Sequence, residues 1–310
     1  MSLRHIAIPS WPAAAPPRLP TYALATRVQT ALQQAQLAWK ANPNGAPPPP
    51  YLISFTPAPT YTLGRRQTEP LSGAELTRLR APLWVSSAES RSQPAAEYAF
   101  APAVLHAPRG GLATYHGPGQ VVLWPVIDLR SPLLHAHLGV RAYTCALEQT
   151  TMAALRRLFG IAGFTTSNPG VWVRGSADSV EKGEEERKIS ALGVHLRRHI
   201  AGLGVAVNLG MPVAGPEDTN PWARIVACGL HDRGVTSVAA HLGLSAAPSA
   251  QDVAAVWAEE FAARIGVRGG DGSSDAPAVE NDDWKSWETR LELDGPDDGY
   301  VEGQALQTQT

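Results

Sequence analysis

Residues 109–129 read RGGLATYHGPGQVVLWPVIDL and hold the two features that decide the fold. The first is a glycine-rich loop, in which four glycines let the backbone reach positive φ or approach a bound molecule closely. The second is the apolar run 121–129, which is typical of a strand covered on both faces. A glycine loop beside a core strand predicts a binding edge, although a tight turn with a core histidine at His116 would leave the same pattern.

Further segments occur along the chain in an order known from one family. They read YTLGRR at 61–66, GVWV at 170–173, KISALG at 188–193, and ACG at 227–229 followed by VTS at 235–237. Together with RGG and TYHGPGQ, they resemble the octanoyltransferases of lipoate biosynthesis, which share a fold with lipoate and biotin protein ligases. The segments span most of residues 51–245, and their common order is far more specific than any one motif.

Composition narrows the class of protein. The chain has 310 residues, 44% of them hydrophobic, which is enough for one large core or two modest ones. It lacks a run of about 18 apolar residues, so we expect no membrane contact. With Cys145 and Cys228 as its two cysteines, it reads as an intracellular chain without a disulfide framework. No CxxC or HExxH motif is present, and we expect neither a bound metal nor a cofactor.

The formal net charge of −2 is unevenly distributed. Residues 269–310 hold eleven acidic and two basic residues, which leaves 24 basic and 17 acidic residues, or +7, in 1–268. A basic body suits an acidic macromolecular partner, but ordinary surface charge explains it equally well. The body lacks the Lys/Arg runs with interleaved aromatics that indicate nucleic-acid binding.

The resemblance implies an α/β (α+β) fold, in which a single domain has a mixed β-sheet core flanked by helices, as in biotin and lipoate protein ligases. We expect residues 1–268 to form this domain, with surface insertions near 41–50, 86–103 and 174–187. Residues 269–310 are expected to form an acidic, flexible tail, in which only 284–293 could become ordered.

Periodicity and capping patterns place the individual elements. Strands are predicted at 3–8 and 51–55, and a hairpin is expected to start at Lys188 and turn around 202–204. Helices are predicted at 22–39, 72–80, 141–160 and 250–265, with another starting near 236 or 237. Cys145, within one of these helices, is expected to be a small buried hydrophobe.

Lys188 and Cys228 are the candidate catalytic residues. Most lysines are solvated charges, and an isolated cysteine is more often structural than reactive. Lys188, however, directly precedes an apolar run, and Cys228 lies in an apolar loop before a glycine. Both also occupy the positions of the catalytic lysine and cysteine in the resembled family. The resemblance therefore implies a Cys/Lys pair in which Cys228 attacks a thioester and Lys188 accepts the thiol proton.

By the same resemblance, two groups of residues border the substrate. They are Arg109, Gly110, Gly111, Leu112, Ala113, Thr114, Tyr115 and His116 in the loop, and Ala191, Leu192, Gly193, Gly204, Val205 and Ala206 in the hairpin. Gly193 and Gly204 would let the backbone approach an acyl chain, although a β-bulge would also select glycine. Two positions depart from the family pattern: Ala227 replaces a usual proline, and Leu203 a usual histidine.

The expected reaction moves an octanoyl group from octanoyl-acyl carrier protein to a lysine of lipoyl domains. The acceptors implied are the lipoyl domains of 2-oxoacid dehydrogenase complexes or the glycine cleavage H protein. A thioester is reactive enough to form an amide without ATP, and the sequence has no Walker-type phosphate loop.

Two alternatives remain open at this level. One is an ATP-dependent lipoate-protein ligase, and the other is a non-catalytic relative that binds carrier or lipoyl domains. We expect the protein to be mitochondrial if its source is eukaryotic, although the sequence shows no clear cleavable leader, and cytoplasmic otherwise.

Overall fold

The computed structural model describes residues 2–11, 14, 16–86, 97–175, 186–225, 234–266, 279–293 and 298–305. Cys228 and Ala227 lie outside these ranges, and so do parts of the expected insertions near 86–103 and 174–187. Within the described ranges, no helix has both the length and the apolar character needed to cross a bilayer.

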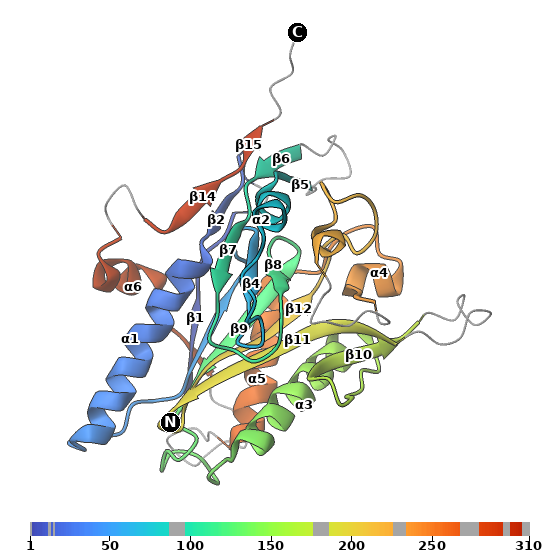
Figure 1. Ribbon diagram of the computed structural model, residues 1–310. Helices are drawn as coiled ribbons and strands as arrows, with labels where there is room; N and C mark the ends of the chain where they lie inside the picture. The colour runs from blue at the N-terminus through green and yellow to red at the C-terminus, as the bar shows by residue number, and fades with distance from the viewer. Residues whose placement is uncertain are drawn as a thin grey trace.

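The core of the described structure is a seven-stranded mixed sheet in the order β10-β11-β12-β9-β3-β1-β13 (Figure 1). Its strands are β1 (Leu3–Ala7), β3 (Tyr51–Phe55), β9 (Gln120–Val126), β10 (Gly170–Arg174), β11 (Glu186–Arg197), β12 (Ile200–Asn208) and β13 (Val279–Asn281). β1 pairs in parallel with β3 and β13, and the other pairings are antiparallel. Every residue of β9 and β12 is buried, as the apolar run in the opening stretch predicts.

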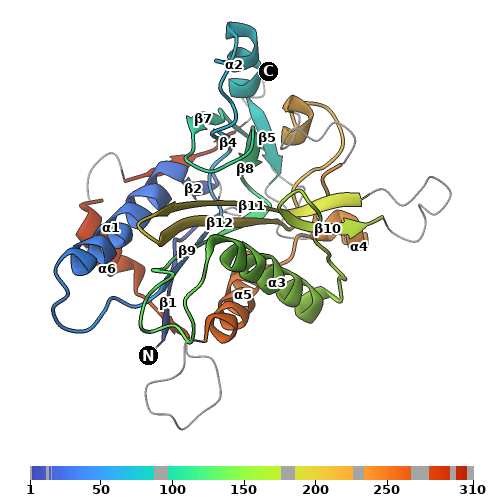
Figure 2. The same ribbon diagram turned by 60° about the horizontal axis from the view of Figure 1, so that its bottom comes forward.

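Helices cover both faces of this sheet (Figure 2). α1 (Tyr22–Ala41) packs on one face, while α3 (Val140–Phe159) and α5 (Ala250–Ile265) pack together on the other. The strand residues alternate between the two layers, as the period of two requires. On β9, for example, Leu123 contacts the α3/α5 layer and Trp124 the α1 layer. The predicted mixed sheet flanked by helices is therefore confirmed.

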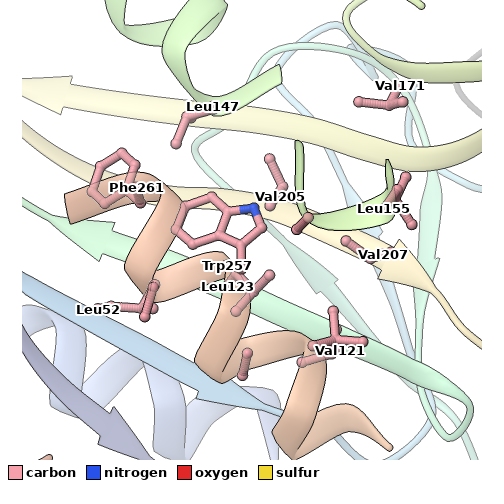
Figure 3. Packing of buried hydrophobic residues seen from close by; sticks show 14 of the residues in the cluster. Leu52, Val121, Leu123, Leu147, Leu155, Val171, Val205, Val207, Trp257 and Phe261 are labelled. Carbon is pink, nitrogen blue, oxygen red and sulfur yellow. The ribbon is translucent and has the colours of Figure 1, made fainter. Parts of the chain in front are cut away.

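Trp257 lies at the centre of the α3/α5 layer (Figure 3). Its indole stacks on Phe261 at 4.9 Å between ring centroids, and its Nε1–H donates to the Thr151 hydroxyl over 3.0 Å. The helix that carries it begins after Ser249, whose side chain accepts from the Asp252 N–H, and it ends at Gly266 in the left-handed conformation. Both ends agree with the capping residues in the sequence.

Smaller sheets surround the glycine-rich loop. β4 (Thr60–Leu63) pairs with β7 (Ala103–His106) and β8 (Thr114–His116), and β5 (Leu83–Ser86) pairs with β6 (Glu97–Phe100). The short helices are α2 (Gly73–Arg80), the 3₁₀ turn η2 (Pro221–Arg224) and α4 (Val238–Leu242). α2 begins with the predicted capping box between Ser72 and Glu75.

Two local predictions were wrong. The hairpin turns at Arg198 and His199, both with positive φ, so Gly202 and Gly204 lie inside β12. A two-residue turn of this type usually contains Asn or Gly, so the sequence analysis placed the turn at the glycines around 202–204. Cys145 is exposed, because the buried face of α3 passes through Tyr143 and Leu147.

Residues 279–283 and 298–305 depart from the expected flexible tail, whereas the helix α6 (Trp284–Leu291) falls within 284–293, the part that was expected to become ordered. β13 extends the main sheet, α6 packs along α1, β14 (Tyr300–Glu302) pairs with β2 (Arg18–Pro20), and β15 (Gln304–Ala305) pairs with β6 (Figure 1). The acidic residues are used in these contacts: Asp282 pairs with Arg4, and Asp298 with Arg18. Such partners are about 280 residues apart in sequence, so local charge did not reveal them.

Candidate active site

A cavity lies between the N-terminus of α1, the glycine-rich loop and the β11–β12 hairpin. Its lining consists of Tyr22, Arg109, Thr114, His116, Trp124, Ala191, Leu192, Gly193, Leu203, Gly204, Val205 and Ala206. The fold thus brings the two predicted groups of substrate residues to one place, although they are about 80 residues apart in sequence. Aromatic and aliphatic side chains dominate the lining, which suits an apolar ligand.

Arg109 supports the loop. Its guanidinium donates to the carbonyl oxygens of Gly110, Leu112 and Thr62 over 3.0, 2.9 and 2.6 Å, and to the Thr62 hydroxyl over 2.7 Å. The side chain is buried, and a Cβ on Gly193 would lie only 2.7 Å from its Cδ. Arg109 therefore holds the loop against β4 and forms the wall beside β11.

The other predicted loop residues do not line the cavity. Gly110, Gly111, Leu112 and Ala113 form the bend that Arg109 braces, and Gly111 has a φ of +84°. Tyr115 is buried on the far side, where its ring packs against Tyr61 at 5.2 Å and Trp222 at 5.9 Å. Their contribution to the site is to shape the loop.

Gly204 lines the cavity, but its missing side chain serves the sheet. A Cβ at this position would lie 2.2 Å from the Leu123 carbonyl oxygen and 2.9 Å from Pro125 Cδ. Any larger residue would therefore push β12 away from β9. This contact explains the glycine by the close approach of two strands, a reason that the sequence analysis did not consider beside an acyl-chain contact and a β-bulge.

His116 belongs to a buried chain of polar groups. Its Nδ1 lies 2.9 Å from Gln120 Oε1, Gln120 Nε2 donates to Asn208 Oδ1 over 2.8 Å, and Asn208 Nδ2 donates to the Thr236 carbonyl over 2.9 Å. Because the last acceptor is a backbone carbonyl, the amide orientations follow, and Nδ1 must carry the proton. Burial and the nearby Arg109 charge lower the pKa of His116 to about 4, which makes it neutral at pH 7.

Lys188 is a buried lysine at the start of the hairpin. Its ammonium donates to the Pro169 carbonyl over 3.0 Å and lies 4.8 Å from the centre of the Trp172 ring. Its backbone N–H donates to the Gly234 carbonyl over 2.9 Å, and its carbonyl accepts from the Thr236 N–H over 3.0 Å. The chain that follows Cys228 is thus bound directly to the backbone of Lys188.

A carboxyl group lies near this lysine. Burial raises the pKa of Glu148, and the Gly170 N–H bond and the positive charge of Lys188 oppose that shift. Lys188 is thus set among a carbonyl, an aromatic face and a nearby acid, each of which attracts a positive charge.

Three lining residues had no assigned role in the sequence. Tyr22 stands at the first turn of α1, with its ring 5.5 Å from that of His116 and 5.0 Å from that of Trp124. Leu203 was noted only as a departure from the family pattern. The periodicity of α1 and β9 marked Tyr22 and Trp124 as apolar, and apolar patterns do not distinguish a pocket wall from a core.

Comparison with known proteins identifies the family of this chain. The family model for the lipoyl protein ligase A/B catalytic domain matches residues 25–262. A probable octanoyltransferase from Schizosaccharomyces pombe is 34% identical over 220 residues, covering 71% of this chain and 80% of the relative. The mitochondrial octanoyl-[acyl-carrier-protein]:protein N-octanoyltransferase LIPT2 of Xenopus tropicalis is 37% identical over 153 residues, covering 49% of this chain and 54% of the relative.

Solved structures share the fold at much lower identity. A bipartite lipoate protein ligase from Thermoplasma acidophilum superposes with a TM-score of 0.53 at 12% identity, covering 94% of this chain and 92% of the other. LipL1 of P. falciparum, solved with lipoate, gives 0.51 at 10% identity, covering 91% and 66%. With a family model that spans most of its length, this chain belongs to the lipoyl protein ligase A/B catalytic domain family.

Proposed function

We propose that this protein is an acyltransferase that moves an octanoyl group from octanoyl-acyl carrier protein to a lysine of a lipoyl domain. The observation that carries the proposal is the setting of Lys188, which is buried three residues before Ala191 of the cavity lining and is tied by its backbone to the chain that follows Cys228. The names of the relatives support the same reaction, since the frog protein is named an octanoyl-carrier-protein:protein octanoyltransferase.

The chemistry proceeds in two steps. The Cys228 thiolate attacks the thioester carbonyl of the donor, the donor C–S bond breaks, and the carrier leaves as a thiol with a proton from Lys188. The acceptor lysine amine then attacks the Cys228 thioester, the C–S bond to Cys228 breaks, and an amide forms while Lys188, neutral after the first step, takes the proton of the amine. Lys188 accepts the thiol proton at the start, which places a positive charge beside the thiolate.

Electrostatics favours this assignment of roles. A free cysteine has a pKa of about 8.5, so only a few per cent is ionised at pH 7. A nearby ammonium can lower that pKa by roughly 1.5 to 2 units, which makes the thiolate the main form. Gly234, whose carbonyl accepts from the Lys188 N–H, is six residues after Cys228. Six residues of fully extended chain span about 20 Å, which is the upper limit on the separation of Cys228 from Gly234.

The neutral His116 suits the acceptor step. With its proton on Nδ1, its Nε2 carries a lone pair, and this nitrogen is the natural hydrogen-bond acceptor for an incoming amine. The Thr114 hydroxyl, also in the lining and buried, has no hydrogen-bond partner among the described residues. We assign it to the acyl carbonyl, which needs a donor.

The acceptors belong to the same proposal. Lipoyl domains of 2-oxoacid dehydrogenase complexes and the glycine cleavage H protein carry suitable lysines, and the frog relative is named as mitochondrial. We therefore propose a mitochondrial location for this protein.

Transfer to an isolated lipoyl domain tests the proposal. The purified protein, octanoyl-carrier protein and the domain are combined without ATP, and the mass of the domain is measured. A gain of one octanoyl group, absent with Cys228→Ala, is the expected result. Labelling that needs free octanoate and ATP and persists in Cys228→Ala would instead assign the protein as a ligase. Binding without any labelling would assign it as a non-catalytic relative.

A further inference from the structure

The β9–β12 pairing is interrupted beside the cavity. Residues 205–208 of β12 pair with residues 120–123 of β9, and hydrogen bonding resumes at Ala201, whose N–H donates to Ile127 over 2.8 Å. Between these points lie Pro125, which has no N–H to donate, and Leu203, with a φ of 59°. Left-handed backbone is strained for a bulky residue, and such strain persists only where surrounding contacts impose it.

Three glutamines of α1 fill this interruption. Gln29 Oε1 accepts from the Leu203 N–H over 2.5 Å, Gln33 Nε2 donates to the Ala201 carbonyl over 3.4 Å, and Gln36 Nε2 donates to the Val126 carbonyl over 3.1 Å. Positions 29, 33 and 36 share one helix face, so the row runs along the strand edge. Gln29 and Gln36 are buried, which is unusual for glutamine and indicates a specific task.

Leu203 stands at one end of the apolar lining. Its partner across the hairpin is Val194, whereas Gly204, Val205 and Ala206 pair with residues nearer to Lys188. Of the β12 residues in the lining, Leu203 is therefore the farthest from Lys188 along the strands. It is buried in the same cluster as Tyr22 and Trp124, which form the wall on the α1 side.

From these contacts we propose that Leu203 limits the length of the acyl chain that the cavity accepts, and that Gln29 is the positioning residue that holds it there. The inference rests on the proposed function, because it takes an acyl chain as the occupant. With its carbonyl near Lys188, the chain would run along the hairpin and end against Leu203. The strained backbone turns this side chain into the lining, and the bond to Gln29 keeps it in that conformation.

Truncation of Leu203 should lengthen the cavity. Each methylene that becomes buried strengthens binding about fourfold. Leu203→Ala removes three carbons, so two further methylenes should fit, and the ratio of decanoyl to octanoyl affinity should rise roughly fifteenfold. Leu203→Gly should do the same while relieving the strain at positive φ, so this second variant retains a folded protein even if the alanine variant does not.

The experiment measures binding of non-transferable amide analogues of octanoyl-, decanoyl- and dodecanoyl-pantetheine by calorimetry. Wild-type protein should prefer the octanoyl analogue, and both Leu203 variants should shift towards longer chains. An unchanged ratio in Leu203→Gly, with normal octanoyl binding, would overturn the inference alone. Failure of the wild-type protein to bind any of the analogues would overturn the proposed function as well.

The role of Gln29 needs its own comparison. Gln29→Met removes the acceptor of the Leu203 N–H and should raise the ratio of decanoyl to octanoyl affinity by at least about threefold. Gln29→Glu keeps an acceptor oxygen, so its affinity ratio should equal that of the wild type. Gln36→Leu is the matched control, since this glutamine is equally buried on the same helix face but bonds to Val126. Equal shifts in Gln29→Met and Gln36→Leu would show general loosening of α1 and contradict the positioning role.

Discussion

At the scale of single residues, the candidate site contains three residues held in unusual states. Lys188 is an almost fully buried lysine, His116 is neutral, and Leu203 has a left-handed backbone. The sequence identified Lys188 and His116 through their motifs. Their states could not be predicted, because each depends on tertiary contacts, such as the Trp172 ring for the lysine and the Tyr22 ring for the histidine.

The Lys188 charge should control the reactivity of Cys228. In a Cys145→Ser background, which removes the exposed thiol, alkylation of Cys228 by iodoacetamide should have a pH midpoint well below 8.5. Lys188→Met keeps the bulk but removes the charge, so the midpoint should rise towards about 8.5 and acyl transfer should slow by roughly two to four orders of magnitude. A midpoint that Lys188→Met leaves in place would rule out the pair.

Because His116 is buried in its neutral form, the free energy of unfolding should fall as the pH is lowered. Its pKa is about 4 in the folded protein against 6.5 when unfolded, so between these values only the unfolded chain binds a proton. Stability from this group is therefore complete above pH 6.5 and falls by about 3 kcal/mol as the pH drops to 4. Asn at position 116 keeps a donor to Gln120 but does not titrate. In denaturant titrations, the free energy of unfolding of His116→Asn should therefore fall less between pH 6.5 and pH 4 than that of the wild type. An identical fall in both proteins would refute the assignment.

At the scale of elements, helices and buried strands were the predictable part. α5, the strand β3 and the capping box of α2 follow from periodicity and local hydrogen-bonding residues, and the structure confirms each of them. The hairpin turn was not predictable, because Arg198 and His199 adopt positive φ without glycine or asparagine. The glutamine row on α1 was missed for a similar reason: its partners are backbone groups of strands that lie far away in sequence.

The α3–α5 contact gives a test at this scale. Thr151 accepts from the Trp257 indole and donates to the Leu147 carbonyl. Thr151→Val should lower the free energy of unfolding by about 1–3 kcal/mol, because it leaves a buried N–H unpaired. Trp257→Phe removes that N–H, so adding Thr151→Val to it should have a smaller effect than in the wild type. Strict additivity in urea denaturation would contradict the hydrogen bond.

At the scale of the whole molecule, the C-terminal segment is part of the fold. Trp284, Trp287 and Leu293 pack into the α1 layer, in the part of the tail that was expected to become ordered, and β14 pairs with β2 beyond that part. Thr21, the N-cap of α1, also donates its N–H to the Gly299 carbonyl over 2.7 Å. The end of the chain thus braces the helix that supplies Tyr22 to the cavity, a long-range arrangement that no local pattern in the sequence could indicate.

This bracing predicts that the end of the chain is required for stability. Trp287→Ala should lower the free energy of unfolding by roughly 3–5 kcal/mol, because it leaves a large cavity between α6 and α1. Leu244→Ala is the control, since Leu244 is an exposed leucine outside the C-terminal segment and its loss should lower the free energy of unfolding far less. If thermal denaturation shows equally small losses of stability in Trp287→Ala and in the control, the C-terminal segment does not brace α1.

The central claim is that Cys228 carries the acyl group during transfer. Intact-protein mass spectrometry after incubation with octanoyl-carrier protein, without an acceptor, tests it most directly. We expect a mass gain of one octanoyl group that hydroxylamine removes, that Cys228→Ala abolishes and that Cys145→Ser leaves in place. An adduct that survives hydroxylamine, or none in a preparation that still transfers octanoyl groups to a lipoyl domain, would contradict it.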